Sequence, residues 1–280
     1  MAADTLPSPT IIAASGGLPV LLSVPHSGRE YPDWLLRRAA SGRAALESLE
    51  DPLVDRLAWR ALGAGPAAVI ANAGRAGIDC NRDAADIDTS VVALPCPEPS
   101  HRARHGLGVV PGRSVLAGPL WRGLVDADDF ARRVAHAHAP YHAALAAELA
   151  RLRSRYGAAL LLDLHSMPPP RRGKPQIVFG DRYGRSADRW VTDPARRIAE
   201  SAGFAVGFND PYAGGWISER HGNPSSGIHA LQVEIDRSCY LDRTLRRPGP
   251  GFDRCARLLE RLTVELGEII LAQQVPQAAE

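Results

Sequence analysis

Two histidines and one glutamate each come at or just after the end of a short apolar run: His26, His165 and Glu234. Apolar runs of four to eight residues are typical of buried strands. Ligands of open α/β sheets bind beyond the carboxyl ends of such strands, so these three side chains are candidates for one site. A single histidine in this position is as readily a hydrogen-bonded structural residue, and Glu234 a salt-bridge partner for an arginine. The presence of all three favours a functional site at the ends of these strands.

Two imidazoles and a carboxylate, with a fourth position left to water, are the ligand set of a catalytic zinc ion. The third protein ligand is then expected from an acid near the first histidine. Glu50, Asp51 and Asp55 are the candidates, because they surround the start of the helix predicted after His26. Asp51 has an alternative role as an N-cap or first-turn acid of that helix.

Two further carboxylates have predicted roles around these ligands. Asp163 lies two residues before His165, so in a strand both side chains project to the same face. It is expected to orient the imidazole from behind, or to be a satisfied buried acid. Glu234 is separate in sequence from the proposed ligands, which suits a general base that takes a proton from water.

The elements that must position these residues alternate along the chain. Strands are predicted over residues 20–24, 67–71, 158–164, 176–179, 204–208 and 229–235. Helices are predicted over 51–62, 126–156 (broken by Pro140), 186–202 and 251–272, and long loops over 89–119 and 207–227. This alternation predicts a three-layer α/β/α fold with a largely parallel, mixed sheet. We expect a flexible lead-in over residues 1–18 and a single domain over 19–275.

Composition excludes several classes of function. The 280 residues carry a net charge of +2, and the basic residues, of which only Lys174 is a lysine, are spread among acids, which disfavours nucleic acid as a partner. No run approaches the roughly 20 apolar residues of a membrane span, and the first residues lack a signal-peptide pattern. Four cysteines without a CxxC pair are expected to be reduced thiols of a cytoplasmic protein. The oligomeric state stays open.

Six short sequence motifs occur in an order that resembles a known family. They are Val24-Pro25-His26-Ser27-Gly28, Glu50-Asp51-Pro52-Leu53-Val54-Asp55, Asp79-Cys80-Asn81-Arg82-Asp83, Pro140-Tyr141-His142, Asp163-Leu164-His165-Ser166 and Gly227-Ile228-His229-Ala230-Leu231-Gln232-Val233-Glu234. Together they resemble the N-formylglutamate amidohydrolase family, over roughly Pro19 to Asp242. That family is related in fold to the zinc carboxypeptidases and the aspartoacylase-like deacylases.

The resemblance implies a zinc-dependent amidohydrolase that cleaves N-formyl-L-glutamate to formate and L-glutamate, an activity of histidine degradation. His26, Asp51 and His165 match the metal ligands, with one Zn²⁺ expected per chain, although other divalent metals suit the same nitrogen and oxygen donors. Glu234 matches the catalytic glutamate.

The resemblance also suggests substrate-binding residues. Asn81 and Arg82 resemble the pair with which zinc carboxypeptidases hold a substrate carboxylate, and a guanidinium suits that task because it binds a carboxylate through two hydrogen bonds. Arg75 is expected to be a second anion contact, and Arg220 and His221 resemble a segment that lines the family's substrate pocket.

The chain also departs from the family. Pro52-Leu53 stands where the family often carries an aromatic residue and a histidine, and the loops over 89–119 and 168–174 are individual to this sequence. Three alternatives follow: the same chemistry on another N-acyl amino acid or small peptide, a catalytically silent ligand-binding homologue, and a serine hydrolase using Ser27 or Ser166. The last is disfavoured because neither serine lies in a Gly-x-Ser-x-Gly turn.

Overall fold

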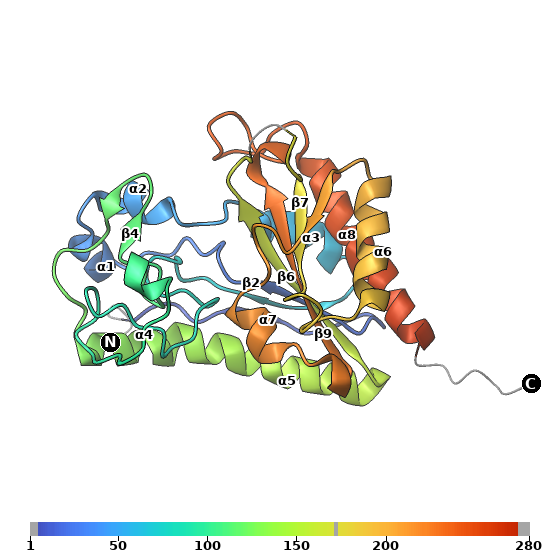
Figure 1. The fold of residues 1–280 in the computed structure, drawn as a ribbon, viewed down its shortest axis with the longest axis horizontal. Coiled ribbons are helices and arrows are strands. Elements are labelled where there is room, and N and C mark those ends of the chain that lie inside the picture. The colour runs from blue at the N-terminus through green and yellow to red at the C-terminus, as the bar shows by residue number, and fades with distance from the viewer. Residues whose placement is uncertain (1–4, 171–172, 274–280) are drawn as a thin grey trace, which may run out of the picture. The chain divides into compact units, whose positions relative to one another are not determined.

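A seven-stranded sheet in the order β1-β3-β2-β6-β9-β7-β8 organises the chain in the computed structural model, which describes residues 5–170 and 173–273 (Figure 1). Parallel pairing joins β2 to β6, β6 to β9 and β7 to β8, and β7 runs antiparallel to β9. The mixed, largely parallel α/β sheet predicted from the sequence is confirmed. The strands are β1 Thr10–Ile12, β2 Val20–Val24, β3 Ala67–Ile70, β6 Ala159–Met167, β7 Ile177–Gly180, β8 Val206–Phe208 and β9 Ile228–Asp236, with the hairpin strands β4 Arg113–Ser114 and β5 Gly118–Pro119 outside this sheet.

Helices fill most of the connections between these strands. They are α1 Asp33–Arg38, α2 Gly42–Glu47, α3 Val54–Leu62, α4 Ala127–Arg133, α5 Ala139–Tyr156, α6 Arg189–Ser201, α7 Trp216–His221 and α8 Phe252–Gln273, with shorter turns at η2 Ala103–His105, η3 Val134–His138, η4 Pro224–Ser226 and η5 Arg237–Cys239. No helix within residues 5–170 and 173–273 is long and apolar enough to cross a membrane.

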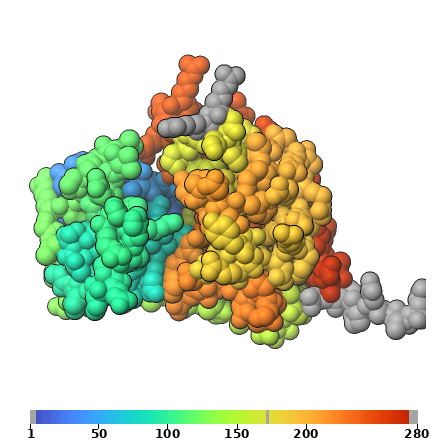
Figure 2. Space-filling view, viewed as in Figure 1, coloured from blue at the N-terminus to red at the C-terminus, as the bar shows by residue number. Residues whose placement is uncertain are grey.

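Helices lie on both faces of the central strands, which gives the three layers. On one face α8 packs against α3 and α6, and Gly267 of α8 lies against the side chains of Leu18 and Val20 (Figure 1). Successive side chains of a strand point to opposite faces, so Ser23 of β2 points to the face away from α8. On that second face α7 contacts β9. In the view of Figure 2, atoms of the segments that follow β7 cover the central strands, and β6 is buried throughout its nine residues.

The described chain divides into two compact units. Within the described residues, one comprises 5–10, 25–51 and 70–143, and the other comprises 11–24, 52–69, 144–170 and 173–273. The sequence predicts one domain over 19–275 and shows no linker. Because the chain passes from one unit to the other five times, no single boundary exists for a linker to mark.

Three predicted elements differ from the structure. The predicted helix from Asp51 begins only at Val54, because Leu53 takes a left-handed conformation with φ of 61°. The strand predicted to stop at Leu164 continues through Met167, so His165 is a strand residue rather than a loop residue. Pro140 does not break the long helix: a π-helical turn, η3, comes just before it and joins α4 to α5.

Three segments predicted without regular structure contain elements. The predicted loop over 89–119 contains η2 and the hairpin strands β4 and β5. Thr10–Ile12 forms the edge strand β1, and Leu6 is buried in a hydrophobic cluster, within the stretch predicted as a flexible lead-in. The few apolar residues of this Pro-rich stretch are enough to pack it against the rest of the protein, although they show no helical or strand periodicity. The predicted loop over 207–227 contains α7 and η4. All four cysteines are free, as predicted.

Candidate functional site

The register of the central strands places three predicted residues on one sheet face. His165 of β6 is the direct partner of Glu234 of β9, and Asp163 is the partner of Ser23 on the other side. Partners in neighbouring strands share a face, as do residues two apart in one strand. Asp163, His165 and Glu234 therefore point the same way at the carboxyl ends of the parallel strands, and all three are buried.

Asp163 contacts the imidazole of His165. Its Oδ2 lies 2.9 Å from His165 Nε2, and its Oδ1 accepts a 2.8 Å hydrogen bond from Ser23 Oγ. A proton on Nε2 satisfies Asp163 and places the electron pair of the His165 ring on Nδ1. That is the tautomer that a metal ligand needs.

Glu234 also has a neighbour on its own strand. Gln232 Nε2 donates a 2.9 Å hydrogen bond to Glu234 Oε1. The two residues are two apart in β9, so the amide and the carboxylate lie along the same face. The bond fixes one carboxylate oxygen, and the glutamate lies beside His165.

A second carboxylate orients His26. Asp79 Oδ1 lies 2.7 Å from His26 Nε2, and Arg75 donates to Asp79 Oδ2 at 2.9 Å. Burial opposes ionisation of Asp79, but the charges of Arg75, His26 and Arg82 outweigh it and hold the pKa of this carboxyl well below its usual range. Asp79 is therefore an anion that accepts a hydrogen bond from Nε2–H, which places the electron pair of the His26 ring on Nδ1.

The acid beside His26 is Asp51 and not Glu50. Asp51 Oδ2 lies 3.2 Å from His26 Nδ1, and the Asp51 amide donates to the His26 carbonyl at 2.9 Å. Glu50 instead accepts a short hydrogen bond from the Tyr31 hydroxyl. Burial and the Glu50 charge raise the pKa of Tyr31, which keeps this hydroxyl a donor. Asp51 precedes α3 and is not part of its first turn.

His26, Asp51 and His165 offer three ligand atoms that lie within 4.8 Å of one another, and all three residues are buried. Chain connectivity explains why the histidines meet. Ser23 and Asp163 are paired in the sheet, and His26 and His165 follow them by three and two residues. Consecutive Cα atoms are only about 3.8 Å apart, so both imidazoles must lie close to the same strand ends.

The donor set fits a zinc-type ion. Zinc bonds of about 2.0–2.1 Å in a tetrahedron separate the ligand atoms by about 3.4 Å, close to the 3.2 Å between His26 Nδ1 and Asp51 Oδ2. Both imidazoles have a carboxylate on Nε2, and a carboxylate on one ring nitrogen is the usual arrangement behind a histidine that binds metal through the other. Three protein ligands leave a coordination position open.

Arg82 has a guanidinium with donors to spare. Its Nε donates to the Leu107 carbonyl at 3.0 Å and its Nη1 to the Asn81 carbonyl at 2.8 Å. Within the described ranges no further hydrogen-bond partner of the Arg82 guanidinium is found, so Nη2 keeps its hydrogens for a ligand. Burial lowers the pKa of Arg82, yet a guanidinium stays charged at neutral pH. The Asn81 amide nitrogen donates to Asp79 Oδ1, so the pair is tied to the carboxylate behind His26.

The remaining predicted residues lie in different surroundings. Arg75 is engaged with Asp79, as described above. Arg220 is exposed, with its guanidinium 5.9 Å from the centre of the Trp216 ring. His221 is buried at the end of α7, and it interacts electrostatically with Asp163. Of the two, His221 therefore belongs to the surroundings of the sheet face that carries Asp163.

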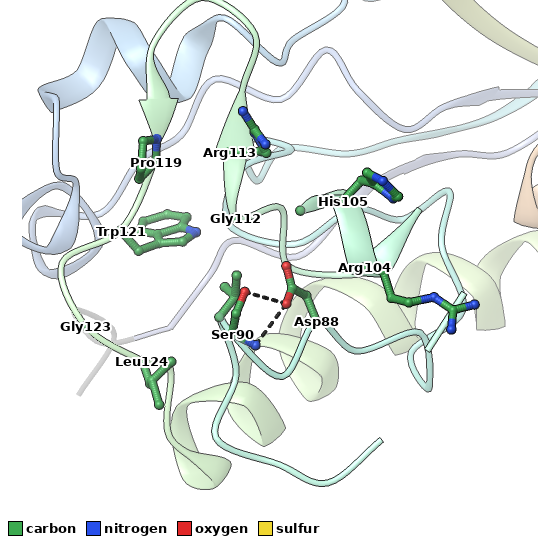
Figure 3. A pocket seen from close by; sticks show the side chains of 12 residues that line it. Asp88, Ser90, Arg104, His105, Gly112, Arg113, Pro119, Trp121, Gly123 and Leu124 are labelled. Carbon is green, nitrogen blue, oxygen red and sulfur yellow. Dashed lines mark hydrogen bonds between the residues drawn. The ribbon is translucent and has the colours of Figure 1, made fainter. Parts of the chain in front are cut away.

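A separate cavity lies around the β4-β5 hairpin. It has a volume of about 520 Å³ and is lined by Asp88, Arg113, Trp121 and others, but by none of the predicted site residues. Figure 3 shows Asp88 bonded to Ser90 in this cavity, with Arg104 pointing away from it. The basic side chains do not converge there, so this cavity does not form a second anion site.

Sequence reasoning missed three supporting residues. Asp79 belongs to one of the six motifs that carry the family resemblance, and it follows Arg75 by four residues. This spacing was the sequence feature that could have indicated an Arg75–Asp79 pair. Ser23 is the single polar residue in an apolar strand, which marks a buried hydroxyl that needs a partner. Gln232 alternates with Glu234 in β9, which places both on one face.

The mixed α/β sheet with a buried His, Asp and His set at its carboxyl edge defines an α/β protein with a candidate metal centre. Residues 18–241 match the sequence profile of N-formylglutamate amidohydrolase. The N-formylglutamate deformylase of Pseudomonas putida is 30% identical over 237 residues, covering 82% of this chain and 84% of that protein. The N-formylglutamate deformylase of Pseudomonas aeruginosa is 29% identical over 236 residues, covering 81% of this chain and 84% of that protein.

A solved structure gives the same answer. The crystal structure of N-formylglutamate amidohydrolase from Ralstonia eutropha matches with a TM-score of 0.87 and 30% identity, covering 95% of this chain and 99% of that one. The chain belongs to the N-formylglutamate amidohydrolase family, whose curated relatives are named as hydrolases of N-formylglutamate.

Burial of His221 predicts a pH dependence of stability. Burial, and secondarily the charge of Arg220, lowers the pKa of His221 to about 4. Between that value and the unfolded pKa of about 6.5, the unfolded chain binds a proton that the folded chain does not, so this residue lowers stability as the pH falls through this window. We expect His221→Gln to remove about 2 kcal/mol of this loss at pH 5.

Urea unfolding of wild type and His221→Gln at pH 7, 6 and 5 measures the difference. His136→Gln, which removes an exposed imidazole, is the control and is expected to behave as wild type. Parallel stability curves for wild type and His221→Gln would show that His221 protonates as easily in the folded chain as in the unfolded one.

Proposed function

We propose that this protein is a metal-dependent amidohydrolase that cleaves N-formyl-L-glutamate to formate and L-glutamate. The observation that carries the proposal is the coincidence of family membership with the buried set of His26, Asp51 and His165, in which His165 is the strand partner of Glu234. The relatives' names supply the substrate.

His26, Asp51 and His165 would hold the ion, and Zn²⁺ is the metal we propose because it prefers this nitrogen and oxygen donor set. When bound, such an ion polarises the amide carbonyl and makes a water molecule more acidic. Asp79 and Asp163 keep both imidazoles turned toward the shared position. Arg75 acts through Asp79, since it holds this carboxylate ionised and in place.

Glu234 moves the proton. One oxygen of its carboxylate is held by Gln232, and the carboxylate lies beside His165 on the same sheet face. We propose that it takes a proton from water as the water oxygen adds to the formyl carbon. The same proton then goes to the amide nitrogen as the C–N bond breaks, which gives formic acid and the free amine and leaves Glu234 ready again. The proton of formic acid passes to the amine, so the products leave as formate and the ammonium form of L-glutamate.

Arg82 holds a carboxylate of the substrate. Its Nη2 has donors to spare, and its other nitrogens are fixed by backbone carbonyls, so the guanidinium is oriented before a ligand arrives. Asn81 positions it from the adjacent residue. His221 is neutral at pH 7 because of its burial, and a neutral imidazole offers a hydrogen bond to substrate without a charge.

Removal of the proton carrier is expected to abolish turnover without emptying the metal site. Glu234→Gln keeps the shape of the side chain but cannot accept the proton, so kcat for formate release from N-formyl-L-glutamate should fall roughly 100- to 10,000-fold. Metal content, measured by elemental analysis, should stay at the wild-type level. Exposed Glu98→Gln is the matched control and should keep wild-type kcat. Wild-type turnover by Glu234→Gln would contradict the proposed base.

Replacement of the guanidinium is expected to act on substrate affinity. Arg82→Lys keeps the charge but loses the planar fork, so KM for N-formyl-L-glutamate should rise roughly 10- to 100-fold, the loss of a charged hydrogen bond of about 1.5–3 kcal/mol. Steady-state kinetics measure KM and kcat separately, and a thermal melt verifies folding. Arg104→Lys, at an exposed position, is the control. An unchanged KM in Arg82→Lys would remove this residue from the substrate site.

A further inference from the structure

A cavity of about 320 Å³ lies at the end of β6, among residues that the mechanism above does not use. Met167 and Pro168 contribute from the strand end, Val178 from β7, and Pro211 and Tyr212 from the loop after β8. Met167 and Val178 are buried, with 2% and 1% of their surface exposed, and so form the floor.

The strand register connects this cavity to the candidate site. Val178 is the direct antiparallel partner of Glu234, and Met167 follows His165 by two residues in β6. Partners and alternate residues share a sheet face, so both floor residues lie on the face that carries His165 and Glu234. The loop over 212–214 covers the next position of this face, because a Cβ on Gly180 would lie 2.6 Å from the Gly214 nitrogen.

The lining is apolar where it is buried and charged only where it is exposed. Lys174 and Asp210, the charged residues of the lining, have opposite signs and are both exposed, so water screens them. A ligand carboxylate in this cavity would have no buried cation to pair with among the lining residues of the described ranges. A hydrocarbon group fits the floor of Met167 and Val178.

The cavity is also too large for a formyl group. A formyl group has one carbon and one oxygen and is of the order of a water molecule, which occupies about 30 Å³ in the liquid. The volume of about 320 Å³ accommodates several more carbon atoms.

We propose that this cavity binds an apolar group of the substrate, and that the protein hydrolyses N-acyl amino acids that carry a larger apolar group than N-formyl-L-glutamate does. The inference rests on the proposed hydrolase function and extends its substrate class. The apolar group belongs either to the acyl chain or to the amino-acid side chain, and both sources have the same chemistry.

Two substrate series test the proposal through release of the free amino acid. The acyl series comprises N-formyl-, N-acetyl- and N-butanoyl-L-glutamate, and the side-chain series comprises the N-formyl derivatives of L-alanine, L-2-aminobutyrate and L-norvaline, which differ by one methylene at each step. We expect kcat/KM to rise along one series by about fourfold per buried methylene, since each is worth about 0.8 kcal/mol. The series that rises identifies the source of the apolar group.

Variants of the floor locate the effect. Val178→Phe fills the cavity and should abolish the rise, lowering the ratio of kcat/KM for the larger to the formylglutamate substrate at least tenfold. Val178→Leu adds one methylene and should lower the same ratio severalfold, so it serves if Val178→Phe does not fold. Val115→Phe makes the same change at a fully exposed position of the β4-β5 hairpin and should keep the wild-type ratio.

Three outcomes would overturn the inference. The first is a wild type that cleaves N-formyl-L-glutamate but gains nothing along either series, and the second is a rise that survives in both Val178 variants. The third is a loss of formylglutamate cleavage in Lys174→Gln, because the cavity would then hold the glutamate carboxylate. If the metal-loaded protein releases no amino acid from any substrate, including N-formyl-L-glutamate, the proposed function itself fails.

Discussion

The in-register pairing of β6 between β2 and β9 is the constraint on which the rest of the site depends. It places Ser23 beside Asp163 and His165 beside Glu234, all on one face of the sheet. A slip of one residue in β9 would turn Glu234 to the opposite face and replace it with an apolar neighbour. Backbone hydrogen bonds thus align a hydroxyl, two carboxylates and an imidazole before any ligand is present.

The two histidines have the same kind of support from different parts of the chain. His165 is held by Asp163 and, behind it, the Ser23 hydroxyl, whereas His26 is held by Asp79 and, behind it, Arg75. In both cases the carboxylate contacts Nε2 and leaves Nδ1 for a ligand. Each buried carboxylate would be costly alone, so the hydroxyl and the guanidinium are as necessary as the acids they satisfy.

The polar side chains at the strand ends were predictable from the sequence, because apolar runs indicate buried strands and a polar residue that ends such a run is easily recognised. This is why His26, His165 and the sheet class follow from the pattern alone. The left-handed Leu53 that separates Asp51 from α3, and the Arg75 bond to Asp79, depend on tertiary contacts that no periodicity records. The cavity floor of Met167 and Val178 was equally invisible, since it joins residues of strands that are not consecutive in sequence.

The central claim is that His26, Asp51 and His165 form one metal site, and metal content tests it most directly. Elemental analysis after dialysis against Zn²⁺ and removal of the excess should find about one ion per chain in wild type. It should find much less in the His26→Ala and His165→Ala variants, whose folding is verified by a cooperative thermal melt. His136→Ala, at an exposed position, should keep the wild-type content. A wild type that binds no divalent metal, or folded His26→Ala and His165→Ala variants that keep a full equivalent, would contradict the account.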